Sequence, residues 1–338
     1  MSKITIKDIA RESGVSITSV SFILNGKTDS VSKETKERVL DVCKKYNYQP
    51  NYLAAALKSK STHFIGILVP DIENSYYSRI LKILEDIFDK KGYSLLISSS
   101  GYDLEKFMGN IRNLVSKSID YCIVIPPSSF QEQNKEELAR LSEHINVSFV
   151  IFDRKINYCN CPVIVNDDIQ GGYLATNYLI KKGHKKIYCI TGSRLVSSSI
   201  DRLTGYKKAL EENNIKYDES LIYEGDYKYA DALDIASKIL KKDKNCSVFA
   251  FNDLMAYAVY KVANELGLKI GKDVSVVGFD DNNFSNLIYP GLTTIRQNVQ
   301  KLCEAVAEEL FLEDCSARTI TIEPELIERG SVNDSTIK

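Results

Sequence analysis

Polar and aromatic side chains follow the ends of several apolar runs in residues 61–338. An Asp-Arg pair, an Asn-Asp pair and an Asp-Asp pair each come directly after such a run. Carboxylates accept hydrogen bonds, guanidinium groups donate them and amides do both, so the set suits a ligand rich in hydroxyl groups. The residues of this set are Asp71 to Tyr77, Asp153-Arg154, Asp167-Asp168, Asn252-Asp253 and Asp280-Asp281, with Arg202, Tyr227 and Gln297 from a helix start and two loops.

Each of these residues also has a purely local interpretation, because Asp and Asn at a strand end can cap the helix that follows. For a single residue this explanation is at least as good. The whole set, arriving in chain order after successive strands, favours a binding site. Catalytic motifs are missing from the sequence: it has no Gly-rich dinucleotide fingerprint, no phosphate-binding loop and no Gly-x-Ser-x-Gly elbow, and its three histidines form no partner pattern. We therefore predict no catalytic residue, metal site or cofactor.

Alternating strands and helices must position this set. Short, continuous apolar runs are typical of parallel strands buried on both faces, and repeated strand–helix units predict doubly wound sheets with right-handed crossovers. So many units exceed one sheet, which predicts two lobes with a cleft at the carboxyl ends of their strands. Predicted strands are 64–69, 93–98, 121–125, 148–152, 163–165, 187–191, 247–251 and 274–279; predicted helices are 76–91, 104–117, 132–144, 170–182, 201–213, 229–241, 254–267 and 299–312.

The first 60 residues differ from the rest in charge. They carry 11 Lys and Arg against 6 Asp and Glu, a net of +5, while the remainder carries −6 and the whole chain of 338 residues −1. A basic head on an acidic body is typical of a nucleic-acid reader attached to another function, although a solvated Lys-rich surface gives the same balance. The motif in this head decides between these two interpretations.

Two short helices joined by a tight turn are predicted in the head. Thr5 and Asp8 have capping-box spacing, Gly14 ends the first helix, Ser16 caps the second, and Asn25-Gly26 ends that one. This is a helix-turn-helix, whose second helix enters the DNA major groove, unless the hairpin merely packs. The predicted DNA-binding residues are Thr5, Ser16, Ile17, Thr18, Ser19, Ser21, Phe22, Asn25, Tyr48, Asn51, Leu57 and Lys58.

A further helix of about two turns is predicted after Pro50, in the Ala-rich stretch 52–60. Such a short segment is marginal alone in water and needs a partner to order it. A minor-groove site could order it, with Leu57 as an apolar wedge between base steps.

These segments resemble the lactose-repressor (LacI/GalR) family of bacterial transcription regulators over about residues 4–332. The resemblance implies a homodimer with a helix-turn-helix at 1–49, a hinge helix at 50–61 and a ligand-binding body at 62–338. It divides the body into lobe 1, about 62–161 plus 292–322, and lobe 2, about 162–291 plus 323–332. The segments are Ile6-Lys7-Asp8-Ile9-Ala10, Gly14-Val15-Ser16, Leu24-Asn25-Gly26, Tyr48-Gln49-Pro50-Asn51, Ile67-Leu68-Val69-Pro70-Asp71, Arg202-Leu203-Thr204-Gly205-Tyr206, Asn252-Asp253-Leu254-Met255-Ala256, 274–280 and 290–294.

The family's ligand positions carry over onto matching residues of this chain. Sugar-binding relatives have an Asp-Arg pair where this chain has Asp153-Arg154, and purine-responsive relatives lack both that pair and the Asn before Asp253. The resemblance therefore implies a monosaccharide or related sugar as effector and double-stranded operator DNA as partner. The ligand positions are Asn74, Tyr76, Tyr77, Asp153, Arg154, Arg202, Tyr227, Asn252, Asp280 and Gln297.

Two positions depart from the family. Phe22 stands where relatives commonly carry Arg or another polar residue, and it cannot make Arg's bidentate contact with guanine. Ala55 replaces a frequent Arg or Gln. We expect a sugar-controlled repressor with its own operator preference; the alternatives are a purine or nucleoside sensor of the same family, or a sugar-processing enzyme.

Composition fits this reading. Hydrophobic residues make up 44% and charged residues 26% of the chain, as in globular proteins, and no apolar run reaches the roughly 18–20 residues of a membrane span. The N-terminus lacks the apolar stretch of a signal peptide, so we expect a cytoplasmic protein without membrane contact. In that compartment its eight cysteines should be buried thiols.

Overall fold

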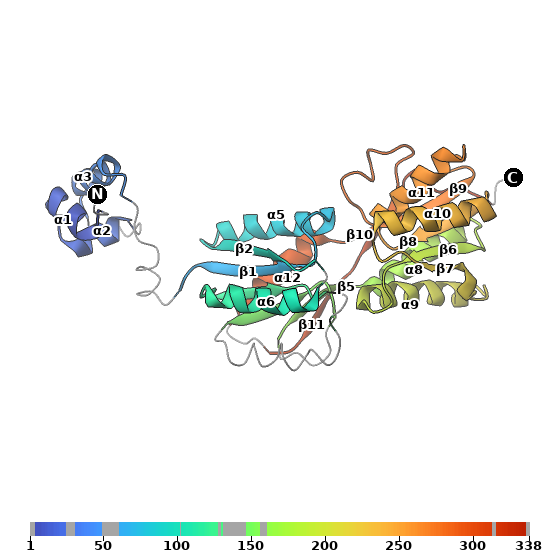
Figure 1. Cartoon of the computed structure of the whole chain (residues 1–338), viewed down its shortest axis with the longest axis horizontal. Coiled ribbons are helices and arrows are strands. Elements are labelled where there is room, and N and C mark those ends of the chain that lie inside the picture. Colours follow the sequence, from blue (N-terminus) through green and yellow to red (C-terminus); the bar gives the residue numbers. More distant parts are fainter. Residues whose placement is uncertain are drawn as a thin grey trace. The chain divides into compact units, whose positions relative to one another are not determined.

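The computed structural model describes residues 4–24, 31–48, 61–101, 103–127, 130, 147–155, 161–312 and 316–335. The chain divides into two compact units, Met1–Thr62 and His63–Lys338 (Figure 1). Within the described part of the chain, no helix is long and apolar enough to cross a membrane.

The described residues of the first unit form three helices: α1 (Ile6–Ser13), α2 (Ile17–Leu24) and α3 (Lys33–Lys45). The Asp8 carboxylate accepts hydrogen bonds from the Thr5 backbone N–H at 3.0 Å and from the Thr5 hydroxyl at 2.7 Å, which fixes the first turn of α1. Gly14 ends that helix in the left-handed conformation, with φ 67°, where glycine has no Cβ penalty.

The next two helices begin at serine caps. The Ser19 backbone N–H donates to Ser16 Oγ at 3.0 Å, and the Thr35 N–H donates to Ser32 Oγ at 3.3 Å. The helices then pack around a small apolar core, so the predicted helix-turn-helix is confirmed. That core consists of Ile9, Ala10, Val20, Ile23, Val39 and Cys43.

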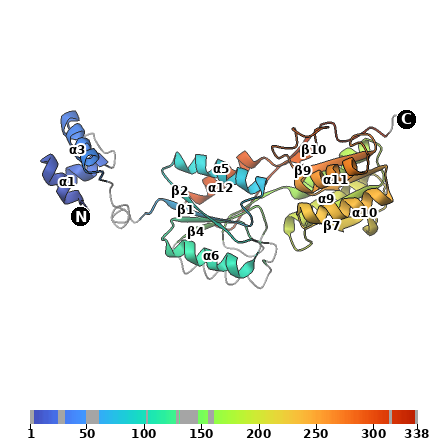
Figure 2. The same cartoon turned by 45° about the horizontal axis from the view of Figure 1, so that its top comes forward.

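The described residues of the second unit form two six-stranded sheets. In the first, with order β11-β5-β4-β3-β1-β2, all strands are parallel. Figures 1 and 2 show α5 and α6 on opposite sides of this sheet; α12 packs with α5 on one face, and α6 covers the other. The elements are β1 (Phe64–Val69), α5 (Ser75–Asp89), β2 (Ser94–Ser99), α6 (Leu104–Ser116), β3 (Tyr121–Val124), β4 (Ser148–Phe152), β5 (Val163–Asn166), α12 (Val299–Leu310) and β11 (Thr319–Ile322).

The second sheet has the order β12-β10-β9-β8-β6-β7. Helix α8 packs with α9, and α10 with α11. Its elements are α8 (Asp168–Lys181), β6 (Ile187–Thr191), α9 (Ser197–Glu212), a 3-10 turn (Glu219–Leu221), β7 (Ile222–Glu224), α10 (Tyr229–Lys242), β8 (Cys246–Ala250), α11 (Asp253–Glu265), β9 (Val274–Asp280), β10 (Thr293–Arg296) and β12 (Glu325–Ile327).

The chain passes between the two lobes after β5, after β10 and after β11. The lobe boundaries implied by the resemblance put 163–165 in lobe 2 and 292–296 in lobe 1; β5 instead pairs with β4 and β11, and β10 with β9. Both crossings therefore follow a strand's carboxyl end. The last crossing also explains why β12 is antiparallel to β10. A chain leaving β11 at its carboxyl end enters the second sheet from the side where the other strands end.

Every predicted strand is present with small shifts at its ends, and so is every predicted helix of residues 61–338 except 132–144. That helix and the one predicted in 52–60 lie outside the described residues. The prediction missed β7, β10, β11 and β12. Three of these, β7, β11 and β12, are edge strands of only three or four residues, too short and too exposed to give an apolar run.

The cysteine prediction is right for five residues and wrong for one. Cys43, Cys122, Cys189, Cys246 and Cys303 are free and buried. Cys161 is buried but forms a disulfide, and sequence spacing alone cannot predict such a pairing.

Candidate functional site

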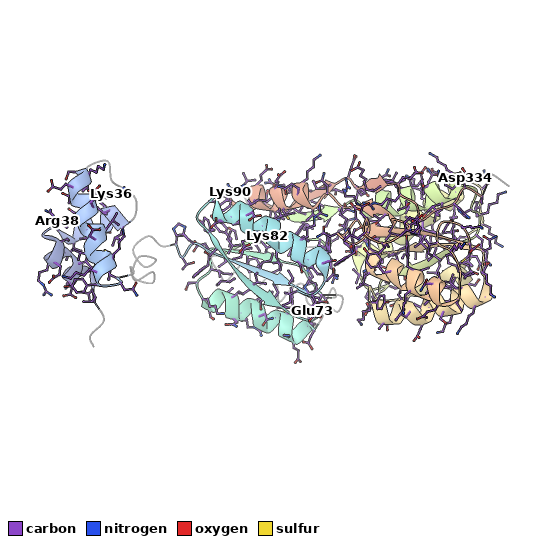
Figure 3. All side chains as sticks on the ribbon, turned by 90° about the horizontal axis from the view of Figure 1, so that it is seen from above. Lys36, Arg38, Glu73, Lys82, Lys90 and Asp334 are labelled. Atoms are coloured by element: carbon purple, nitrogen blue, oxygen red, sulfur yellow. The ribbon has the colours of Figure 1, made fainter. Side chains whose placement is uncertain are left out.

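The second helix of the first unit presents the predicted DNA-binding face. Ile17, Thr18 and Phe22 are exposed on α2, while Val20 and Ile23 on its other side are buried. Basic side chains are available nearby, and Figure 3 marks Lys36 and Arg38 on α3.

The other predicted DNA-binding residues have mixed positions. Thr5 and Ser16 are helix caps, and Ser19 lies 2.9 Å from Ser16, Oγ to Oγ. Tyr48 packs against the core of this unit, and Ser21 is half-buried on α2. Asn25, Asn51, Leu57 and Lys58 lie outside the described residues, as does the predicted hinge helix.

A polar cavity lies in the second unit, where strands of both sheets end. All ten predicted ligand positions line it. Their role in binding a ligand stays a prediction. They come from the start of α5, the segments after β4, β7, β8 and β10, helix α9 and the end of β9. The lining residues are Asn74, Tyr76, Tyr77, Asp153, Arg154, Ser198, Arg202, Tyr227, Asn252, Asp280 and Gln297.

Two tyrosines hold the carboxylate of Asp153. Tyr76 donates to Asp153 Oδ1 at 2.8 Å and also lies 2.9 Å from Gln297 Oε1, while Tyr77 donates to Asp153 Oδ2 at 3.3 Å. Burial and the Asp153 carboxylate raise the pKa of Tyr76, so its hydroxyl keeps its proton and acts as a donor. Arg154 donates to the Tyr77 hydroxyl at 3.3 Å and to the Pro126 carbonyl at 2.6 Å.

Arg202 is clamped on the opposite side. Its Nε donates to Asp168 Oδ1 at 2.8 Å, its Nη1 donates to the Phe251 carbonyl, and its guanidinium lies 3.6 Å from the centre of the Phe279 ring. Burial alone would lower the pKa of this group, but Asp168, Tyr227 and Asp280 raise it above its ordinary value. Arg202 is therefore a fixed positive charge that is 4% exposed.

Gln297 joins the two sides. Its amide nitrogen donates to Asp280 Oδ1 at 2.7 Å, and its oxygen faces Tyr76 of the first lobe. Burial raises the pKa of Asp280 well above its ordinary value, although Arg202 opposes this. Gln297 follows β10 at a crossing between lobes, so its contacts depend on how the lobes sit against each other.

Close backbone packing sets the position of the Arg202 side chain. A Cβ on Gly172 of α8 would lie 2.1 Å from the Arg202 carbonyl oxygen, and one on Gly205 of α9 would lie 2.0 Å from the Ile169 carbonyl oxygen. Only glycine permits this contact between α8 and α9, which brings Asp168 to Arg202. Gly192 similarly leaves space for the Tyr227 ring, which lies 2.0 Å from a Cβ built there.

Three lining residues have left-handed backbones, with φ of 69° at Asp153, 61° at Tyr227 and 110° at Asp280. Such conformations are costly for residues other than glycine and gather at functional sites. Helix capping occurs here as well: Asn74 accepts from the Tyr76 N–H at 3.0 Å and Asn252 from the Met255 N–H at 2.9 Å. These two asparagines therefore cap helices and also line the cavity.

Comparison with known proteins gives the family. A profile described as "Bacterial regulatory proteins, lacI family" matches residues 5–51, and one described as "Periplasmic binding protein-like domain" matches 176–332. The HTH-type transcriptional repressor PurR of Vibrio atlanticus (strain LGP32) is 34% identical over 97% of this chain and 98% of its own length. The chain belongs to the lacI family of bacterial regulatory proteins.

Solved structures of this family share the fold. The lac repressor dimer bound to operator and the anti-inducer ONPF covers 98% of this chain and 100% of its own, with a TM-score of 0.85 at 24% identity. A LacI family transcriptional regulator from Enterococcus faecium with bound ribose covers 80% of this chain and 99% of its own, with a TM-score of 0.71 at 26% identity. The predicted family and fold class are confirmed, and the chain is a DNA-binding transcriptional regulator.

Two residues of the site, Ser198 and Asp168, are not among the predicted ligand positions. Ser198 lines the cavity and lies 3.3 Å from the Tyr227 hydroxyl, but it falls seven residues after β6 and no strand-end pattern marks it. Asp168 is in the strand-end set of the sequence, and the structure gives it the role of partner to Arg202. Among the described residues, no group of His, Cys, Asp or Glu is arranged to hold a metal ion.

Proposed function

We propose that this regulator is a repressor, working as a homodimer, whose operator affinity is controlled by a small uncharged sugar bound in the cavity. The lining carries this proposal. Carboxylates, guanidinium groups and amides surround the space together with the tyrosine rings of positions 76, 77 and 227. Each sugar hydroxyl both donates and accepts, which such a mixed set can satisfy, while aromatic faces contact the sugar's C–H groups.

The balance of charge favours an uncharged ligand. Asp153 and Asp280 line the cavity together with Arg154 and Arg202. Arg154 Nε lies 4.0 Å from Asp153 Oδ2, and Asp168 pairs with Arg202. A phosphorylated sugar would therefore meet no excess positive charge. The ribose bound to the regulator from Enterococcus faecium fits the same chemistry.

On DNA, two copies of α2 would read the two halves of a pseudo-palindromic operator, one from each protomer. The net charge of +5 in residues 1–60 supplies the phosphate contacts, so binding should weaken steeply with salt. We propose no catalytic role for the cavity; its proposed role is to bind the ligand that controls the operator affinity of the DNA-binding unit.

A thermal-unfolding screen tests the effector class, because a ligand that binds only the folded state raises the melting temperature. The panel contains D-ribose, D-xylose, D-glucose, ribose 5-phosphate, adenine and adenosine. We expect an uncharged sugar to raise the melting temperature of wild type and of Asp234→Asn, an exposed control on α10, but not of Asp280→Asn. Stabilisation by adenine or adenosine alone would overturn the sugar assignment in favour of a purine sensor, and stabilisation only by ribose 5-phosphate would overturn the charge argument.

A further inference from the structure

Helix α2 contains none of the side chains that usually read bases by paired hydrogen bonds. Its sequence is Ile-Thr-Ser-Val-Ser-Phe-Ile-Leu, without Arg, Lys, Asn, Gln, Asp or Glu. Bidentate recognition of guanine needs Arg or Lys, and that of adenine needs Asn or Gln. Sequence reading by this helix therefore depends on hydroxyl groups and apolar contacts.

The outward face of α2 is apolar where it would meet the bases. Ile17 is 44% exposed and Phe22 is 42% exposed, although both are large hydrophobic residues on a helix of eight. At 100° per residue Ile17, Thr18 and Phe22 share one side of the helix, while Val20 and Ile23 point into the core. Two exposed apolar side chains on one helical face indicate a contact surface.

The apolar feature of a base edge in the major groove is the 5-methyl group of thymine. We infer that α2 selects its half-site through thymine methyl groups, with Ile17 and Phe22 as the contacting side chains. This specificity rests on the assigned DNA-binding function. DNA, rather than a protein, is the occupant of this face because the segment that carries it is basic: residues 1–60 carry 11 Lys and Arg against 6 Asp and Glu.

The test begins with selection of binding sites for the full chain from a pool of random duplexes. Each thymine of the selected half-site is then replaced by deoxyuridine, which removes only the 5-methyl group. Loss of one buried methyl should weaken binding about three- to fourfold, and loss from both half-sites about tenfold.

Variants assign each methyl group to a side chain. Wild type should bind the thymine duplex more tightly than the deoxyuridine duplex. At the base that Phe22 contacts, Phe22→Ala should bind the two duplexes with equal affinity, and Ile17→Ser should do the same at the base that Ile17 contacts. Lys33→Ala, an exposed cation at the start of α3, should weaken both duplexes alike and keep the ratio unchanged. Thermal unfolding of each variant checks that the substitution leaves the unit folded.

Two failures are distinguishable. If no duplex is selected, the DNA-binding function itself is contradicted. If a site is selected but a duplex with deoxyuridine binds as well as one with thymine at every position, the methyl assignment is overturned while the DNA-binding function stands.

Discussion

The exposed face of α2 and the cavity of the second unit differ in burial and in charge. The face of α2 is exposed and uncharged, and it is held by a small apolar core beneath it. The cavity is buried and charged, and its residues hold one another: Tyr76 binds Asp153, Gln297 binds Asp280, and Arg202 binds Asp168. Substitutions on α2 should therefore act singly and change specificity, whereas substitutions in the cavity should act through their partners and change stability as well as binding.

The largest effect is expected at Arg202. Arg202→Ala leaves Asp168 buried without its partner, and breaking a buried ion pair costs about 3–5 kcal/mol. Urea unfolding of the variant measures this loss. Arg194→Ala removes a surface ion pair with Glu219 and should stay within about 1 kcal/mol of wild type. Equal losses in the two variants would contradict the contrast between buried and exposed charge.

The free energy of unfolding, measured as a function of pH, should show the effect of the buried Asp253 carboxyl. Burial raises its pKa to about 6, although Ser285, Thr294 and the Asn282 N–H donate to it. The unfolded value is about 3.9, so the folded state holds this proton more tightly, and its stabilising contribution is lost as pH rises from about 4 through 6. Across this range the free energy of unfolding should fall by on the order of 2–3 kcal/mol.

Measured unfolding free energies should show a larger step in wild type than in Asp253→Asn. Burial also raises the pKa of Asp168 to about 6, so a smaller step remains in the variant. The exposed control Asp234→Asn should follow wild type across the range. A step of the same size in Asp253→Asn and in wild type would have to come entirely from other groups, and the assignment to Asp253 would then fail.

Backbone contact between α8 and α9 gives the next effect. Gly172→Ala places a methyl group 2.1 Å from the Arg202 carbonyl oxygen, which forces the helices apart and should cost about 1–3 kcal/mol. Gly109 on α6 is the matched control, because a Cβ there meets nothing within 4 Å. Gly109→Ala should stabilise the protein by up to about 1 kcal/mol, so thermal unfolding should shift in opposite directions for the two variants.

The smallest effect concerns a contact between the lobes. Lys155 of the first lobe lies 2.6 Å from Asp201 of α9, and its backbone N–H donates to Ser197 Oγ at 3.1 Å. The lysine side chain is 40% exposed, so we expect the ion pair to contribute less than about 1 kcal/mol to the free energy of unfolding or to ligand binding. Calorimetric titration with the sugar found in the screen should show a change of a few-fold at most; a larger loss would give this exposed pair a role that the buried network does not explain.

Sequence reasoning found the cavity better than it found the elements around it. Residues such as Asp153 and Asn252 could be predicted because buried parallel strands give clear apolar runs, and ligand groups follow strand ends. Ser198 could not, because its place depends on how helix α9 approaches the cavity. The lobe crossings at β5 and β10 were misplaced for a related reason: which sheet a strand joins is decided by its neighbours, and these lie far away in the sequence.

The central claim is that occupation of the cavity controls the DNA-binding unit. The direct measurement is operator affinity, by fluorescence anisotropy, with and without the sugar found in the screen, for wild type and for Asp280→Asn. The account predicts that sugar changes the affinity of wild type, typically five-fold or more for a coupled pair of sites, while Asp280→Asn binds the operator like sugar-free wild type and does not respond. An identical response in both proteins, or none in wild type at a sugar concentration that saturates the cavity, would contradict it.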